Sequence, residues 1–219
     1  MKKLLCLALA LLCVTAGAFA ESVPSKNTAD MVNVVIDRTL NPNIPADSGF
    51  MVMPVLDEDP VQAEAYMENI ALCQTEIAKL AEAVGQGEAG AEGSAVESYF
   101  GEIRDSEGNA VILTEALGTQ TLVVNEFMPL VVSGYDTTYG DTVLTFQFKT
   151  PYAQDEAVVM LVGIENNPET ETIEWTAFEG VGVGEEGAVQ VEFTPEILET
   201  IQSNLALLAV VSAGEAANP

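Results

Sequence analysis

Hydrophobic and polar residues alternate with a period of two in three stretches of the second half of the chain, residues 142–149, 172–176 and 188–193. Successive side chains of a β-strand point to opposite faces, so this alternation is typical of a strand with one buried and one solvated face. Residues 157–164 are instead continuously hydrophobic, which is typical of a central strand covered on both faces. These patterns predict an antiparallel sheet.

Residues 31–40 and 49–56 carry weaker alternation and form two more candidate strands. Pro54 lies in the second of them, and a proline cannot donate a hydrogen bond to a neighbouring strand. We therefore predict that this strand lies at a sheet edge or ends early. The pattern leaves open whether the two strands join the later sheet.

Residues 59–85 show helical periodicity, because their hydrophobic residues recur at spacings of three and four. Asp59 and Pro60 fit the start of a helix, and Gly85 fits its end. The hydrophobic stripe consists of Ala63, Tyr66, Ile70, Cys73, Ile77, Leu80 and Val84, and the opposite face of Glu64, Glu68, Gln74, Lys79 and Glu82. The stripe predicts packing on the protein's own sheet. Its heptad-like spacing makes pairing with a second copy the alternative.

Shorter signals mark the rest of the chain. Residues 86–93 contain only Gln, Gly, Ala and Glu, and predict a flexible connector. Ser94 and Glu97 have the spacing of a capping box, which predicts a short helix at residues 94–100, with a strand as the alternative. Turn residues at 105–109 predict a hairpin. Further strands are predicted at residues 121–125, 127–133 and 205–212, and a helix at residues 195–203.

The predicted fold class is α+β, with an antiparallel β-sandwich preceded by a strand pair and one long amphipathic helix. The predicted organisation is a signal peptide at residues 1–20, an N-terminal part at residues 21–93 that contains the helix, and the sandwich at residues 94–219.

A resemblance adds detail to this fold. The order of Ile173-Glu174-Trp175, residues 187–191, a short helix and residues 208–211 resembles the C-terminal β-sandwich of uncharacterised secreted proteins from clostridia-like gut anaerobes. The resemblance covers at most residues 96–213. It implies an immunoglobulin-like sandwich and a secreted setting, and it brings no catalytic residue.

The N-terminus has the features of an export signal. Lys2 and Lys3 precede a hydrophobic core, and Ala18-Phe19-Ala20 stands before Glu21 as a signal peptidase site. We predict cleavage after Ala20 and a secreted protein, extracellular or periplasmic. Later hydrophobic runs are shorter than the ~20 residues that span a bilayer, so we expect no membrane insertion.

The chain is strongly acidic, with 34 acidic and seven basic residues and a net charge of −27. Cleavage after Ala20 removes two lysines and brings the charge to −29. Such a field repels nucleic-acid phosphates and favours cationic partners, so nucleic acid is excluded as a partner. The acids do not follow the spacing of an EF-hand loop, and we expect weak calcium binding at most.

Histidine is absent from the sequence, which excludes Ser-His-Asp and Cys-His catalysis and histidine-based metal sites. Cys73 is the only cysteine that remains after cleavage, so no intrachain disulfide forms. Its place on the hydrophobic stripe indicates a core residue rather than a nucleophile. We therefore predict no enzymatic activity, no cofactor and no metal site.

The predicted ligand contact is the loop at residues 134–141. Tyr135 and Tyr139 offer flat apolar faces with hydroxyl groups, and Asp136 and Asp141 offer acceptors, which suits a carbohydrate or a protein surface. The alternative is a corner in which one tyrosine packs in the core and caps backbone groups.

A second candidate is a cluster of acids near the only tryptophan, made of Glu165, Glu169, Glu171, Glu174 and Trp175. Paired carboxylates of this kind hydrolyse glycosides. The alternative is a chance cluster among many acids, with Trp175 on the hydrophobic side of its strand and therefore in the core.

The predicted function is a secreted, non-catalytic binding or interaction module for an extracellular protein or carbohydrate. The alternatives are a carboxylate-based extracellular polysaccharide hydrolase and a surface-assembly subunit that oligomerises through the helix stripe at residues 63–84.

Overall fold

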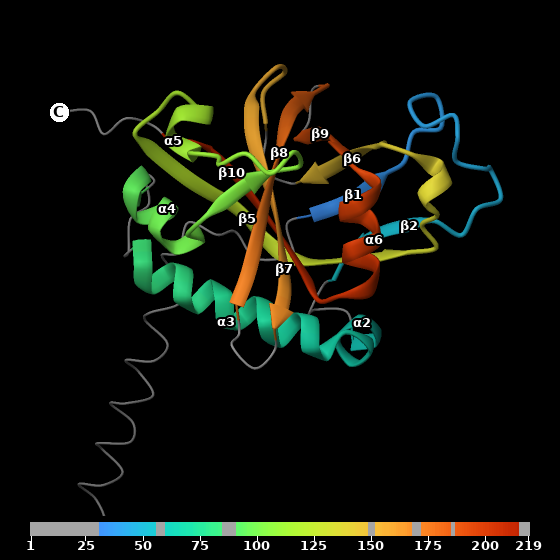
Figure 1. Cartoon of the computed structure of the whole chain (residues 1–219), viewed down its shortest axis with the longest axis horizontal. Coiled ribbons are helices and arrows are strands. Elements are labelled where there is room, and N and C mark those ends of the chain that lie inside the picture. The colour runs from blue at the N-terminus through green and yellow to red at the C-terminus, as the bar shows by residue number, and fades with distance from the viewer. Residues whose placement is uncertain are drawn as a thin grey trace, which may run out of the picture.

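The computed structural model describes a mostly antiparallel β-sheet with helices on both of its faces (Figure 1). The predicted signal peptide at residues 1–20, the predicted helix start at Asp59 and most of the predicted connector lie outside the described residues. The described residues are 31–55, 60–84, 91–148, 152–167, 172–184 and 187–214.

Ten strands of the described residues belong to one sheet. Eight of them follow the order β1-β6-β9-β8-β7-β10-β5-β2, with β3 beside β5 and β4 beside β8. All neighbours are antiparallel except β4 and β8. The strands are β1 (Met31–Val35), β2 (Met51–Pro54), β3 (Ala91–Glu92), β4 (Ile103–Asp105), β5 (Thr121–Ser133), β6 (Thr142–Phe148), β7 (Ala157–Asn167), β8 (Thr172–Val183), β9 (Ala188–Phe193) and β10 (Ala206–Ala213).

Helices cover the two faces of the sheet and create two cores. On one face, α3 and α4 pack over β5, β10 and the neighbouring strands (Figure 1). On the other face the sheet curls until its end strands β1 and β2 meet, and α6 packs into this curl. The helices are α2 (Pro60–Ala65), α3 (Met67–Val84), α4 (Gly93–Phe100), α5 (Leu113–Ala116), the 3₁₀ turn η2 (Thr137–Tyr139) and α6 (Pro195–Ser203).

The periodicities predicted the central strands correctly. In β6, Leu144, Phe146 and Phe148 are buried and the residues between them are only half-buried. The continuous hydrophobic run forms β7, which contributes alternate side chains to the two cores, and β10 does the same. Both of these strands lie inside the sheet, where each face needs hydrophobic cover.

Residues 121–133 form one strand, β5, where two were predicted. A β-bulge separates the predicted halves, because Val211 pairs with Val124 while Val210 pairs with Glu126. The extra residue shifts the alternation by one position, so that Val124 before the bulge and Phe127 after it enter the same core. The hydrophobic alternation is therefore interrupted at the bulge although the strand continues through it.

The α+β class with an antiparallel sheet is confirmed, but the immunoglobulin-like sandwich is not. The described strands are joined into one curled sheet, whereas a sandwich has two separate sheets packed face to face. Strands β1 and β2 join this same sheet, by pairing with β6 and β5. The parts predicted at residues 21–93 and 94–219 thus share a sheet and its cores.

The strand that contains Pro54 does lie at an end of the sheet order, and it ends at this proline. The predicted long helix is divided at Tyr66 into α2 and α3. Its predicted polar face is exposed, and Cys73 and Leu80 of its stripe are buried against the sheet. The stripe therefore packs within its own chain. The polar residues Asn69 and Glu76 are also buried on α3, which the stripe did not predict.

Helix α4 forms where a helix was predicted and ends at Gly101, whose φ is 69°. The predicted capping box is wrong, because Glu97 does not cap its own helix. Its Oε1 accepts hydrogen bonds from the backbone N–H (2.9 Å) and the hydroxyl (2.8 Å) of Thr114, and so it caps α5. A side chain that was predicted to act locally instead fixes the position of the next helix.

Candidate functional site

The predicted ligand loop at residues 134–141 is built around a buried tyrosine. Tyr135 is 7% exposed, and its ring packs edge-on against Phe50 and Tyr139 with ring centroids 5.3 and 5.8 Å apart. Its hydroxyl donates to the carbonyl of Gly140 at 2.9 Å. Burial, and secondarily the negative charge of Asp141, raise the pKa of this tyrosine. Tyr135 is thus a core residue.

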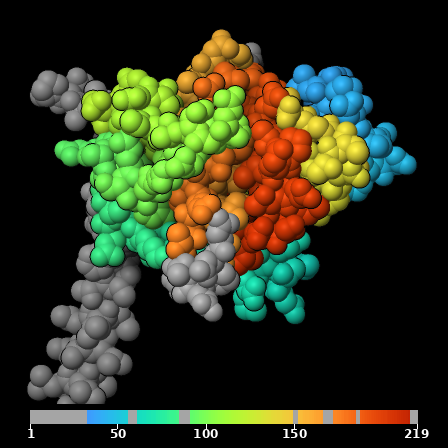
Figure 2. Space-filling model, in the orientation of Figure 1, coloured from blue at the N-terminus to red at the C-terminus, as the bar shows by residue number. Residues whose placement is uncertain are grey.

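Asp136 stabilises the conformation of the loop. Its Oδ1 accepts hydrogen bonds from the hydroxyl (2.7 Å) and the backbone N–H (2.9 Å) of Thr138, and these bonds lower the pKa of the carboxyl. Tyr139 is half-buried and Asp141 is exposed. The loop lies beside α6 on one face of the molecule (Figure 2). Its role in ligand contact stays a prediction, and Tyr139 and Asp141 are the side chains available for it.

The structure divides the predicted acid cluster between the two faces of the sheet. Glu174 pairs with Ile164, whose side chain lies in the core under α6. Glu165 is one position further along β7, and so it faces the side covered by α3. Glu169 and Glu171 lie outside the described residues. The two carboxylates that the structure places therefore do not share a site.

Trp175 belongs to the core beneath α4. It is 5% exposed, and its indole contacts Phe100 and Phe127 edge-on, with ring centroids 4.9 and 5.8 Å apart. Gly163 lies directly opposite it on β7, where a Cβ atom would be 2.6 Å from the indole ring. Its ring is therefore enclosed by core residues.

A groove of about 880 Å³ lies between α3 and the turn that connects α6 to β10. The first half of α3 forms one wall, and the last turn of α6 with Leu205 forms the other. Residues of β5 and Glu165 of β7 complete the lining. These four elements are far apart in the sequence and meet only because α3 and α6 cover opposite faces near the same end of the sheet.

The groove is negatively charged. Glu68, Glu76 and Glu165 are its charged lining residues, and no lysine or arginine is found among the described residues that line it. The C-terminal turn of α6 lines the same groove and presents the negative end of a helix dipole, equivalent to about half an elementary charge. The site thus favours a cationic ligand.

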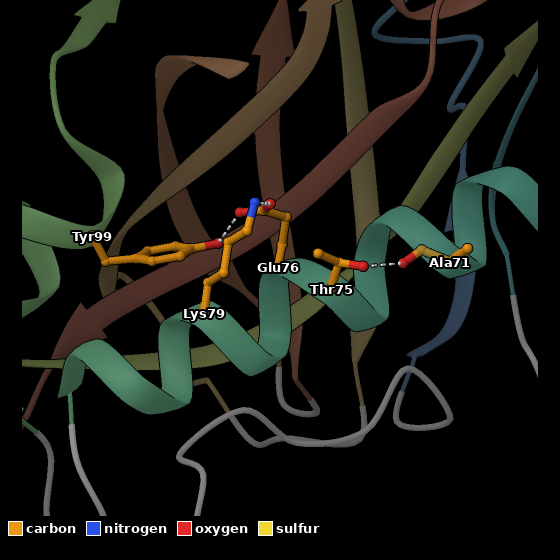
Figure 3. A network of polar contacts seen from close by, with 5 residues as sticks. All are labelled: Ala71, Thr75, Glu76, Lys79 and Tyr99. Atoms are coloured by element: carbon orange, nitrogen blue, oxygen red, sulfur yellow. Dashed lines mark hydrogen bonds and ion pairs between the residues drawn. The ribbon is translucent and has the colours of Figure 1, made fainter. Parts of the chain in front are cut away.

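Glu76 is held in a buried polar network at the side of the groove (Figure 3). Its Oε1 lies 2.7 Å from the Nζ of Lys79, and the hydroxyl of Tyr99 donates to its Oε2 at 3.0 Å. Figure 3 shows the tyrosine reaching from α4 to this carboxylate on α3. The network joins the two helices and fixes the carboxylate in one orientation.

Asn69 lies about two turns before Glu76 on α3 and also lines the groove. It is 8% exposed, and its carboxamide makes no hydrogen bond with any described residue. Its amide nitrogen and oxygen are not among the fully buried unpaired atoms of the described residues, so water or a ligand can still reach them. The small part of Asn69 that remains exposed lies at the groove.

The groove is connected to the predicted loop through Gln202 of α6. This residue lines the groove, and its Oε1 accepts a hydrogen bond from the backbone N–H of Tyr135 at 2.8 Å. The predicted site residues are therefore neighbours of the groove without lining it. The sequence analysis missed the groove itself. The signal that could have found it is a pair of polar residues, Asn69 and Glu76, which follow the helical spacing of the buried face of α3.

A smaller cavity of about 340 Å³ lies between the β4 turn and α6. Glu174 and Glu196 line it together with Arg104, whose guanidinium pairs with Glu102 and donates to the carbonyl of Gly108. Among the described residues, no three side chains of Cys, Asp or Glu are grouped as a metal site requires. In the described part of the chain, no helix combines the length and hydrophobicity needed to cross a bilayer.

The network around Glu76 predicts a pH dependence of stability. Burial, and then the charge of Glu76, raise the pKa of Tyr99. Above about pH 10, the usual pKa of tyrosine, the unfolded chain releases this proton while the folded protein keeps it, so the free energy of unfolding falls as the pH rises. The loss approaches about 1.4 kcal/mol per pH unit for each such tyrosine.

Tyr99→Phe removes this ionising group. We expect the stability of the variant, measured by urea unfolding at about pH 9 and about pH 11, to fall less than that of the parent. Burial also raises the pKa of Tyr152, so part of the fall remains until Tyr152→Phe is added. Equal falls in the parent and the double variant would contradict this account.

The groove and its buried network are therefore the best-defined candidate site. The resemblance proposed for residues 96–213 stays a prediction. No protein-family model, no curated protein and no solved structure matches the chain.

Proposed function

We propose that this protein is an exported, non-catalytic binding module whose ligand site is the groove between α3 and the α6–β10 turn. The observation that carries the proposal is Asn69, a largely buried residue that lines the groove and whose carboxamide has no hydrogen-bond partner among the described residues. The volume of the groove, about 880 Å³, is in the range of sites that hold small molecules or peptide segments.

The walls of the groove support a binding role. They are formed by secondary-structure elements that pack on the core, so the polar groups are held in place before a ligand arrives. The carboxylate of Glu76 is already engaged by Lys79 and Tyr99. The predicted cleavage after Ala20 would place such a site outside the cytoplasm, where its partners are extracellular or periplasmic.

The proposal is tested by a two-dimensional ¹H–¹⁵N NMR screen of the isotope-labelled protein against a mixed library of peptides, polyamines and oligosaccharides. We expect at least one ligand to shift the side-chain amide signals of Asn69 and Gln202 and the backbone signals of α3. The side-chain amide of Asn125, far along β5 and hydrogen-bonded to Ser212, is the internal control and should not shift. A library that leaves the groove signals unchanged would overturn the proposal.

A hydrolase remains the second candidate, because Glu76 and Glu165 line the same groove and glycoside hydrolysis requires two carboxylates facing one cavity. Release of reducing sugar from polysaccharides is measured for the parent, Glu76→Gln and Glu165→Gln. The binding proposal predicts no turnover by any of the three. Turnover by the parent that disappears in either variant would replace the binding module with an enzyme.

A further inference from the structure

We propose that the groove binds a lysine or arginine side chain of an extended peptide, with Asn69 hydrogen-bonding the peptide backbone. This inference rests on the proposed function and adds the class of ligand to it. Three features of the groove lead to it independently: its charge, the Asn69 carboxamide that has no partner among the described residues, and its aromatic residue Tyr66.

The charge of the groove selects a cation. Its charged lining residues are the glutamates Glu68, Glu76 and Glu165, and of these Glu76 is already paired with Lys79. Glu165 is half-buried on β7 and makes no ion pair with a described residue. A partly buried carboxylate attracts an ammonium or guanidinium group more strongly than one that is fully solvated. Glu165 is therefore the expected partner of the cationic side chain.

The carboxamide of Asn69 selects a peptide over a simple cation. A carboxamide presents an N–H donor and a carbonyl acceptor side by side, which is the complement of the C=O and N–H that a peptide backbone presents. Neighbouring side chains do not compete for the ligand, because the Thr75 hydroxyl donates to the carbonyl of Ala71 and the Asn204 amide donates to the carbonyl of Thr200. Asn69 is thus a largely buried lining group that is left to bind the backbone.

Tyr66 supports the same class of ligand. It lies at the junction of α2 and α3, lines the groove and is half-buried. The face of a tyrosine ring attracts ammonium and guanidinium groups. A long side chain such as lysine can place its methylene groups against Leu72 and Ile201, which also line the groove, while its charged end reaches a carboxylate.

Binding is measured by fluorescence polarisation with a fluorescein-labelled octapeptide that carries two lysines in a glycine-serine background. Matched peptides carry norleucine or glutamate in place of both lysines, and spermidine is used as a competitor to represent a small cation. The purified protein is compared with Glu165→Gln, Asn69→Leu and Glu82→Gln. Glu82→Gln is the charge-matched control, because Glu82 lies on the exposed face of α3 and does not line the groove.

We expect the lysine peptide to bind and the norleucine and glutamate peptides not to bind. Glu165→Gln should weaken binding of the lysine peptide by about tenfold through loss of a charge-assisted hydrogen bond. Glu82→Gln should change it by less than about twofold, because an exposed charge outside the groove is screened by salt. Equal losses in these two variants would show that the peptide follows the overall charge, and would overturn the site.

Asn69→Leu separates a peptide from a small cation. The leucine keeps the size of the side chain and removes its hydrogen bonds, so the lysine peptide should bind about fivefold more weakly while competition by spermidine is unchanged. The far-ultraviolet circular dichroism and urea midpoint of the variant establish that it is folded. Unchanged peptide binding, or spermidine binding as tightly as the peptide, would overturn the peptide assignment.

The NMR screen described above distinguishes the two proposals. If a neutral oligosaccharide shifts the groove signals and the lysine peptide does not, the cationic ligand is wrong and the binding module stands. If neither shifts them, both proposals fall together. If the lysine peptide shifts the signals of Asn69 and Gln202, both are supported.

Discussion

Trp175→Ala should lower the free energy of unfolding by about 3–5 kcal/mol, the range for removal of a large aromatic side chain from a well-packed core. The indole contacts Phe100 and Phe127 and covers Gly163 on the neighbouring strand. Alanine would leave a cavity that these neighbours cannot fill, because Phe100 is held in α4, Phe127 in β5 and Gly163 in β7. The loss would come from the core beneath α4 alone, since Trp175 does not line the groove.

Urea unfolding followed by far-ultraviolet circular dichroism measures this loss, because the substitution removes the only tryptophan and its fluorescence. The matched control is Val181→Ala on the same strand, where the side chain is exposed and the expected loss is below about 1 kcal/mol. Equal losses in the two variants would contradict the core position of Trp175. Binding of the lysine peptide by folded Trp175→Ala should be unchanged, since a ligand-stacking tryptophan would show the opposite pattern.

Gly182→Ala should lower the free energy of unfolding by about 3 kcal/mol, at the upper end of the usual cost of inserting a methyl group into packed structure. A Cβ atom at this position of β8 would lie 1.9 Å from the carbonyl oxygen of Ala153. The backbone of Gly182 donates to Glu156 and accepts from Asp155, at 2.8 and 2.9 Å. Residues 153–156 therefore cannot move away without breaking hydrogen bonds on both sides.

Gly49→Ala is the control for this prediction. A Cβ atom at Gly49 meets no atom within 4 Å, and the substitution lowers the entropy of the unfolded chain, so stability should be unchanged or rise by up to about 1 kcal/mol. The free energies of unfolding of both variants are measured by thermal and urea unfolding. A Gly182→Ala protein as stable as Gly49→Ala would show that residues 153–156 move freely, which would contradict the role given to their hydrogen bonds.

The groove changes how the acidic composition is understood. The net charge alone predicts a general attraction for cations, which any exposed glutamate on this surface shares. The structure concentrates that attraction at one groove, which is lined by the half-buried Glu165 of β7 and by Asn69 of α3. Variants that are matched in charge and differ in position therefore separate a built site from the overall field.

The local elements were determined by the sequence, because each depends on side chains within a few positions of one another. The alternation of Leu144, Phe146 and Phe148 specified one buried face, and the continuous run at residues 157–164 specified two. Pro54 marked an edge, and the hydrophobic spacing around Cys73 specified a helix that packs on a sheet. These patterns require only the periodicities of strand and helix.

The relations between distant elements were decided by the tertiary structure alone. Alternation shows that a strand buries one face, but the same pattern fits two facing sheets or one curled sheet with α6 inside it. The bulge in β5 reversed the alternation and made one strand resemble two. Glu97 caps a helix 17 residues away instead of its own, a choice set by where α5 packs.

The candidate site also depended partly on local sequence and partly on the packing of distant elements. The composition of the 134–141 loop was visible in the sequence, but the burial of Tyr135 against Phe50 depends on a strand that pairs with β5 from far away in the chain. The groove needs α3, β7 and α6 to meet at one end of the sheet, and no local pattern encodes such a meeting. Sequence periodicity fixes which face of an element is buried, whereas the packing of distant elements fixes what that face meets.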